Sequence, residues 1–173
     1  MHELILGGVR SGKSRLAERL ASGSGLPVTY IATASAGDAE MAERIAQHQA
    51  DRPGHWTLVE EPLALASVLQ THAAENHCLL VDCLTLWLTN LLLTDDGERL
   101  ASERVALLDV MPTLPGRLIL VSNETGMGVV PLGELSRRFC DEAGRLHQAL
   151  AQTCDRVILT VAGLPHVLKG DPV

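Results

Sequence analysis

The residue types best suited to chemistry stand close to the start of this 173-residue sequence, in the segment GGVRSGKS at 7–14. They match the pattern G-x-x-x-x-G-K-[ST], in which glycines let backbone N–H groups close around phosphate oxygens. We expect Lys13 to reach the β- and γ-phosphates of a nucleotide and the Ser14 hydroxyl to bind Mg²⁺. Arg10 could also contact phosphate from inside the loop. The predicted phosphate-binding residues are Gly7, Gly8, Val9, Arg10, Ser11, Gly12, Lys13 and Ser14.

A second metal-binding side chain is expected at Asp82. It ends the apolar run LLVD, an arrangement in which a buried strand delivers an aspartate to the magnesium ion of a nucleotide. The same aspartate could instead cap the helix that starts directly after it, and the two roles are compatible. Asn123 and Glu124 follow another apolar run, at the end where α/β sheets place ligands. The segment NETGMGVVP that they open is either a flexible part of the site or a plain connection.

His48 lies within ERIAQHQADRP at 43–53, four residues after Arg44 and four before Arg52. Three interpretations stay open on local grounds: a surface helix residue, a buried core histidine or a chemical group. Its helical neighbours alone favour a partly buried structural histidine. The phosphate-binding loop changes what a nearby nucleophile could attack, because neutral imidazole is a good nucleophile near pH 7.

The elements that must position these residues alternate between apolar strands and helices. Strands are expected at 3–8, 27–34, 55–60, 78–83, 117–124 and 155–163, and helices at 13–23, 38–50, 62–75, 84–93, 98–111 and 132–154. This order predicts an α/β fold of the P-loop NTPase (RecA-like) class, with a mostly parallel central sheet and helices on both faces. We expect residues 1–173 to form one domain, with 163–173 as a tail.

The composition argues against several classes of partner. Aromatic residues make up 2% of the sequence, the formal net charge is −7 and no basic run occurs, so we expect no nucleic acid partner. No apolar run is long enough for a membrane span or a signal peptide, which predicts a cytoplasmic protein. The cysteines lack a CxxC pattern and are expected to be reduced thiols of the core. They are Cys78, Cys83, Cys140 and Cys154.

Seven segments, taken in order, are more specific than the phosphate-binding loop alone. They are GGVRSGKS, YIATA, EMAERIAQHQADRP, WTLVEEP, LLVDCLTLWLTNLL, SNETGMGVVP and FCDEAGRLHQALA. Together they resemble the bifunctional adenosylcobinamide kinase / adenosylcobinamide-phosphate guanylyltransferase family of cobalamin biosynthesis. The resemblance covers about residues 3–165.

The resemblance implies two reactions that use Mg²⁺. The first phosphorylates adenosylcobinamide with GTP, or with ATP. The second transfers GMP from GTP to adenosylcobinamide phosphate, giving adenosylcobinamide-GDP and pyrophosphate. In the family the histidine of R-I-x-x-H-x-x-x-R-P becomes guanylylated; here that residue is His48, and Lys13 is the second implied catalytic residue. The resemblance also implies a homo-oligomer, for which a trimer is expected.

Further contacts are implied by the same resemblance. Glu60 is expected to bind the ribose or the guanine edge, with Glu61 as the alternative. Apart from the resemblance, the kinase step needs a group near the acceptor hydroxyl, and Asp82 or Glu124 could serve. His147 stands where asparagine is common in the family; it is expected on a helix surface, and the alternative is that it reaches a ligand or a neighbouring subunit and alters corrin binding. The implied nucleotide contacts outside the phosphate-binding loop are Ala32, Thr33, Ala34, Gln49, Ala50, Asp51, Arg52, Glu60 and Asp82.

Two other functions compete with this interpretation. One is a RecA-like ATPase that acts as a motor or switch without histidine chemistry. The other is a subunit that binds nucleotide without turning it over. Covalent labelling of the protein by GTP separates both from the family's chemistry.

Overall fold

A computed structural model describes residues 1–34, 53–94 and 96–173. The helix expected at 38–50 lies outside the described residues, and so does His48. Among the described residues, no helix is both long and apolar enough to cross a bilayer. All four cysteines are free; three are buried as expected, while Cys140 is half-buried.

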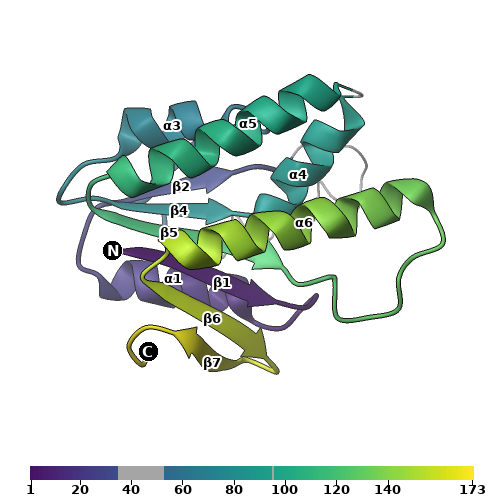
Figure 1. Cartoon of the computed structure of the whole chain (residues 1–173). Coiled ribbons are helices and arrows are strands. Elements are labelled where there is room, and N and C mark those ends of the chain that lie inside the picture. The colour runs from purple at the N-terminus through teal and green to yellow at the C-terminus, as the bar shows by residue number, and fades with distance from the viewer. Residues whose placement is uncertain (35–52, 95) are drawn as a thin grey trace.

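A seven-stranded sheet forms the centre of the molecule (Figure 1), with the strand order β3-β2-β4-β5-β1-β6-β7. Within the described ranges, neighbouring strands are parallel except for the β6–β7 pair. The strands are β1 His2–Gly7, β2 Val28–Ala32, β3 Thr57–Glu60, β4 Cys78–Asp82, β5 Arg117–Asn123, β6 Arg156–Val161 and β7 Leu164–Lys169. The parallel order agrees with the α/β interpretation of the sequence.

Helices cover both faces of the sheet (Figure 1), so central strands are buried on two sides. Along β1, Leu4 and Leu6 pack in the core under α3 to α6, whereas Ile5 packs in the core under α1. This burial on both sides explains why the strands read as continuous apolar runs. The helices are α1 Lys13–Gly23, α3 Leu65–His72, α4 Leu84–Leu93, α5 Gly97–Val110 and α6 Glu134–Thr153, with a short 3₁₀ helix at Met111–Thr113.

The expected tail at 163–173 is wrong, because β7 pairs with β6 in an antiparallel hairpin. Its turn places Ala162 and Gly163 at positive φ values of 52° and 79°. Most of β7 is exposed, so the strand has no apolar alternation that a sequence pattern could reveal. Its position at the edge of the sheet tolerates Pro165. Lys169 Nζ ties β7 to carbonyls at the end of α6.

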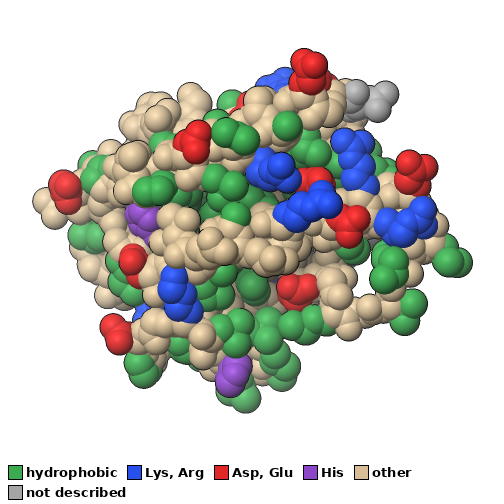
Figure 2. Space-filling view, in the orientation of Figure 1, with side chains coloured by type: hydrophobic (Ala, Val, Ile, Leu, Met, Phe, Trp, Pro, Cys, Tyr) green, Lys and Arg blue, Asp and Glu red, His purple; other side chains and the backbone are tan. Residues whose placement is uncertain are grey.

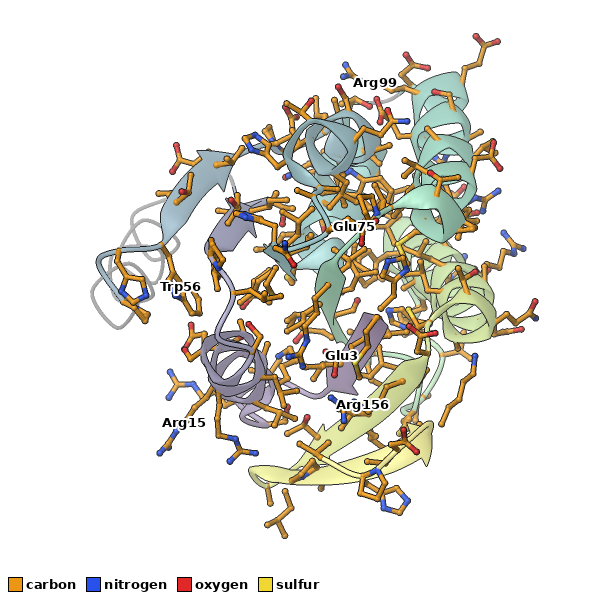
Figure 3. All side chains as sticks on the ribbon, turned by 90° about the vertical axis from the view of Figure 1, so that its left-hand side faces the viewer. Glu3, Arg15, Trp56, Glu75, Arg99 and Arg156 are labelled. Carbon is orange, nitrogen blue, oxygen red and sulfur yellow. The ribbon has the colours of Figure 1, made fainter. Side chains whose placement is uncertain are left out.

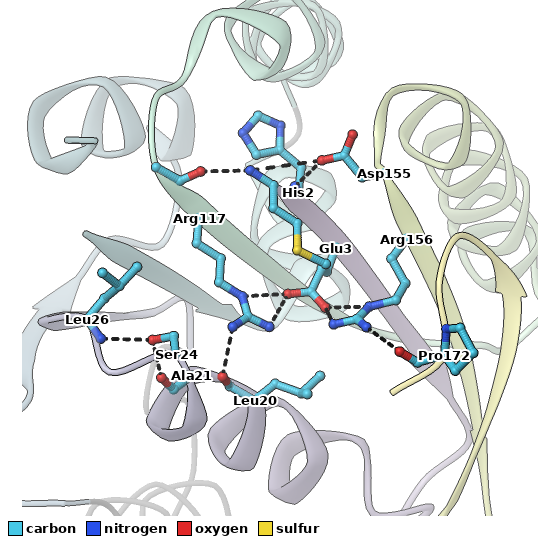
Figure 4. A network of polar contacts seen from close by, with 12 residues as sticks. His2, Glu3, Leu20, Ala21, Ser24, Leu26, Arg117, Asp155, Arg156 and Pro172 are labelled. Carbon is cyan, nitrogen blue, oxygen red and sulfur yellow. Dashed lines mark hydrogen bonds and ion pairs between the residues drawn. The ribbon is translucent and has the colours of Figure 1, made fainter. Parts of the chain in front are cut away.

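One buried carboxylate joins the amino-terminal ends of the central strands (Figures 3 and 4). Glu3 on β1 has no exposed surface. Its Oε2 accepts from Arg117 Nε on β5 at 2.7 Å, and its Oε1 accepts from Arg156 Nε on β6 at 2.8 Å. The two arginines also donate to the carbonyls of Leu20 on α1 and of Pro172 near the carboxyl end. Three strands, a helix and the final segment therefore meet at one side chain.

Replacing Glu3 by glutamine tests this network. Glu3→Gln keeps the side-chain size but leaves two buried guanidinium groups against a neutral amide. We expect the free energy of unfolding to fall by about 3–5 kcal/mol, as measured by urea denaturation followed by circular dichroism. The control Glu75→Gln changes an exposed glutamate between α3 and β4 and should stay within about 0.5 kcal/mol of the wild type. A loss from Glu3→Gln as small as that of the control would contradict the network's role.

Candidate nucleotide-binding site

The phosphate-binding loop connects β1 to α1, as the sequence predicts. Gly12 stands at the N-cap of α1 with φ 94°, a conformation that glycine adopts without strain. Lys13 begins the helix, and its ammonium donates to the Gly8 carbonyl at 3.2 Å, so it lies over the loop. Ser14 follows in the first turn and is half-buried. Loop amides, a lysine and a helix N-terminus thus converge where an anion binds.

Two distant segments hold the loop in place. Gly163, in the β6–β7 turn, donates its backbone N–H to the Ser11 carbonyl at 2.8 Å, and Glu124 donates its N–H to the Gly7 carbonyl at 3.0 Å. Gly7 leaves no space for a side chain, because an added Cβ would lie 2.4 Å from Ser11 Oγ and 2.6 Å from the Thr160 carbonyl. The sequence analysis did not predict the hydrogen bond from the β6–β7 turn to the loop, because it treated that segment as a tail.

Asp82 ends β4 at the same edge of the sheet as the loop. The N-cap position of the helix that follows is Cys83, one residue after Asp82, and its side chain makes no capping hydrogen bond. The Thr33 hydroxyl donates to the Cys83 carbonyl at 2.7 Å and accepts from the Cys83 N–H at 3.0 Å. Thr33 is fully buried, so it positions the end of β4 instead of presenting its hydroxyl to solvent.

Charges of opposite sign meet near Cys83. Burial raises the pKa of the Cys83 thiol; the Asp82 carboxylate raises it further, and the Lys13 ammonium lowers it. The carboxylate and the ammonium therefore both act on the same part of the site. The Ser14 hydroxyl and the Asp82 carboxylate are oxygen donors, which suit Mg²⁺. Within the described ranges no three His, Cys, Asp or Glu side chains form a metal-binding group.

Glu60 and Glu61, the two candidates for a nucleotide contact, lie in different surroundings. Glu61 Oε1 accepts the N–H groups of Leu63 and Ala64, each at 2.8 Å, and so closes the turn before α3. This turn delays the helix, which begins at Leu65 and not at the expected position 62. Glu60 is exposed at the end of β3, where it is the more accessible of the two carboxylates.

The end of β2 lies between the two acidic residues. Ala32 pairs in register with Glu60 on one side and with Asp82 on the other. Ala32 and Ala34 are half-buried, so this stretch is partly accessible at the edge where the P-loop lies. The expected contacts at Gln49, Ala50, Asp51 and Arg52, like His48, lie outside the described residues.

His147 is not the surface residue that the sequence predicts. It is 8% exposed, because it shares a buried stripe of α6 with Ala143, Leu146 and Leu150. Its Nε2 lies 2.7 Å from Ser122 Oγ. Burial lowers the pKa of His147, and the neighbouring Glu124 carboxylate opposes this shift. The i, i+3, i+4, i+7 spacing of the stripe was the available signal for its burial.

Replacing Gly7 by alanine tests the close packing under the loop. Because the new Cβ would meet backbone as well as side-chain atoms, the loop must shift. We expect Gly7→Ala to weaken binding of Mg²⁺–GTP at least about tenfold, or 1.4 kcal/mol, in isothermal titration calorimetry. The control Gly23→Ala, at the end of α1, meets no atom within 4 Å and should bind like the wild type. Unchanged affinity in Gly7→Ala would contradict the packing argument.

Solved structures resemble this chain in fold. The RadB recombinase matches with a TM-score of 0.51 and 15% identity, over 91% of this chain and 73% of that one. The type III secretion ATPase EscN from enteropathogenic E. coli matches with a TM-score of 0.57 and 17% identity, over 92% of this chain and 41% of that one. At such identities the likeness shows the fold alone, and that fold is the expected RecA-like P-loop class.

Sequence relatives are far closer. The bifunctional adenosylcobalamin biosynthesis protein CobP of Pseudomonas aeruginosa is 69% identical over 173 residues, covering 100% of both chains. The protein CobU of Escherichia coli K12, which bears the same description, is 38% identical over 96% of this chain and 98% of its own. The family model "Cobinamide kinase / cobinamide phosphate guanyltransferase" matches residues 3–168. The chain belongs to this cobinamide kinase / cobinamide phosphate guanyltransferase family.

Proposed function

We propose that this protein carries out two steps of cobalamin biosynthesis. It phosphorylates adenosylcobinamide with a nucleoside triphosphate, and it transfers GMP from GTP to adenosylcobinamide phosphate through a guanylyl group on His48. The full-length match to the family carries this proposal. The P-loop geometry supports it, because both reactions break a phosphoanhydride bond of a bound triphosphate.

The residues of the loop bind and orient the triphosphate. The N–H groups of the loop and the N-terminus of α1 would face the phosphates, and the Lys13 ammonium would turn from the Gly8 carbonyl to the β- and γ-phosphates. Ser14 and Asp82 would hold Mg²⁺, which supplies charge neutralisation on the phosphate oxygens. Glu60 would bind the ribose or the guanine edge. Arg52 would neutralise charge near the α-phosphate.

The guanylyl transfer divides into two displacements at the α-phosphorus. A neutral imidazole nitrogen of His48 attacks it, a P–N bond forms and pyrophosphate leaves with the electrons of the broken P–O bond. A phosphate oxygen of adenosylcobinamide phosphate then attacks the same phosphorus and the P–N bond breaks. The acceptor can therefore bind after pyrophosphate has left.

The same proposal includes a homo-oligomer, for which we expect a trimer, in the cytoplasm. An exposed apolar surface supports association, since large apolar patches on soluble proteins mark contact sites. Figure 2 shows hydrophobic side chains over the segment between β5 and α6. The most exposed of them are Met127, Val129, Val130 and Leu132.

Loss of the nucleophile tests the covalent chemistry. We expect Mg²⁺ and α-³²P-GTP to label the wild-type protein with an acid-labile, alkali-stable bond, because a phosphoramidate has this stability. His48→Ala should carry no label on a denaturing gel. His55→Ala, which changes an exposed histidine of the following segment, should label normally. Label that persists in His48→Ala, or wild-type protein without label, would refute the guanylyl-histidine.

Removing the loop lysine tests the phosphate contacts. Lys13→Ala loses a charge-assisted hydrogen bond to phosphate, so we expect GTP affinity to fall by roughly 10- to 100-fold and labelling at subsaturating GTP to fall with it. Equilibrium binding of a fluorescent GTP analogue measures the first effect. Arg15→Ala, two positions along α1 on an exposed side chain, is the matched control (Figure 3). Wild-type affinity in Lys13→Ala would show that Lys13 has another role.

A further inference from the structure

Three polar side chains form a chain of contacts at the end of β5, and guanylyl transfer makes no use of them. His147 Nε2 lies 2.7 Å from Ser122 Oγ, and His147 Nδ1 lies 3.7 Å from Glu124 Oε2. Strand alternation explains the arrangement, because Ser122 and Glu124 are two positions apart and face the same helix, α6. A histidine packs less favourably in the buried apolar stripe of α6 than an apolar side chain would. Its polar contacts with Ser122 and Glu124 compensate for this burial.

Glu124 stands beside the start of the P-loop. Gly7 pairs in register with Asn123, and the next residue, Glu124, donates its N–H to the Gly7 carbonyl. The Glu124 side chain is 20% exposed. Its carboxylate is therefore mostly buried but still accessible from the end of the sheet where a triphosphate would bind.

The two oxygens of this carboxylate differ. Oε1 accepts the N–H of Gly126 at 2.6 Å, whereas Oε2 lies 3.7 Å from His147 Nδ1. A carboxylate only accepts, so the neutral ring is best oriented with its proton on Nδ1 toward Glu124 and with Nε2 accepting from the Ser122 hydroxyl. Burial lowers the pKa of His147 and so favours the neutral ring, although the Glu124 carboxylate opposes this shift. Oε2 keeps its lone pairs for an incoming hydroxyl.

We propose that Glu124 is the catalytic base in phosphoryl transfer to adenosylcobinamide, and that His147, held by Ser122, is a positioning residue for its carboxylate. The inference rests on the kinase half of the proposed function. The acceptor hydroxyl oxygen attacks the γ-phosphorus and a P–O bond forms. The bond from the γ-phosphorus to the bridging oxygen breaks, and the nucleoside diphosphate leaves with its electrons. The hydroxyl proton passes to Glu124 Oε2 and then to water.

The geometry favours Glu124 over Asp82 for this role. Asp82 lies beyond β5 from the P-loop strand, in the order β4-β5-β1, and its carboxylate is assigned to Mg²⁺. A metal-bound carboxylate is a weak base. Glu124 instead directly follows β5, the strand adjacent to β1, and opens a loop that an acceptor can approach.

Separate assays of the two half-reactions on the full chain test the base. Glu124→Gln keeps the acceptor for the Gly126 N–H but loses basicity. We expect kcat for transfer from γ-³²P-GTP to adenosylcobinamide to fall on the order of 100-fold or more, with the KM for GTP within about threefold. Labelling of the protein by α-³²P-GTP should persist. Glu75→Gln should match the wild type in both assays.

Variants of His147 test the positioning role with a rescue that a purely structural role would not produce. His147→Leu fits the apolar stripe and should lower kcat for phosphoryl transfer roughly tenfold. His147→Asn places an amide near the Nδ1 position, facing Glu124, and should recover most of the loss. His147→Gln places its amide near the Nε2 position, facing Ser122, and should not recover the lost kcat.

The outcomes separate this inference from the proposed function. Glu124→Gln that phosphorylates at the wild-type rate, or that loses label and phosphorylation together, would overturn the role of Glu124. His147→Asn no better than His147→Leu would overturn the positioning role. Wild-type protein that labels but does not phosphorylate would overturn the inference and leave guanylyl transfer standing. Wild-type protein that phosphorylates without labelling would refute the histidine chemistry alone.

Discussion

The carboxylate of Glu3, held between Arg117 and Arg156, is the interaction on which the arrangement of the central strands depends. Parallel strands are joined by long crossover connections, so no short turn fixes their register. A side-chain contact that three such strands share is therefore a strong constraint on how they align. It acts at the amino-terminal ends of β5, β1 and β6. The opposite ends of the same three strands carry Glu124, the P-loop and the β6–β7 turn. The ion pairs of Glu3 at the amino-terminal ends of these strands thus help to fix the spacing of the groups at their carboxyl-terminal ends.

The site separates tasks between strands. The strand β1 leads into the P-loop, β4 ends at the carboxylate that we propose as a Mg²⁺ ligand, and β5 leads into the carboxylate that we assign to proton transfer. Thr33 and His147, both buried, hold the ends of β4 and β5 from neighbouring elements. Side chains that never meet the nucleotide therefore determine where the reacting groups lie, which is the usual relation between a rigid scaffold and a catalytic edge.

Sequence patterns predicted elements whose signal is local. Buried parallel strands are apolar throughout, and the P-loop pattern carries its own geometry, so β1, α1 and β4 were placed closely. The strand β7 has neither an apolar run nor a recognisable motif, because most of it is exposed. It forms a strand only through its pairing with β6. Glu60 and Glu61 are adjacent and chemically identical, so the sequence could not show that Glu61 bonds to the following turn while Glu60 is exposed. The spacing along α6 contains a signal for the burial of His147, but its contacts with Ser122 and Glu124 come from another element, which a single helix pattern does not contain.

The turn at Gly163 has a consequence for the order in which the protein assembles. It supports Ser11 through a backbone hydrogen bond, although the two residues lie near opposite ends of the sequence. Contacts between such distant positions form late in folding, because a long loop must close first. A chain emerging from the ribosome therefore exposes its phosphate-binding glycines long before their support exists. The loop gains this hydrogen bond only once the carboxyl-terminal hairpin has been synthesised and has docked.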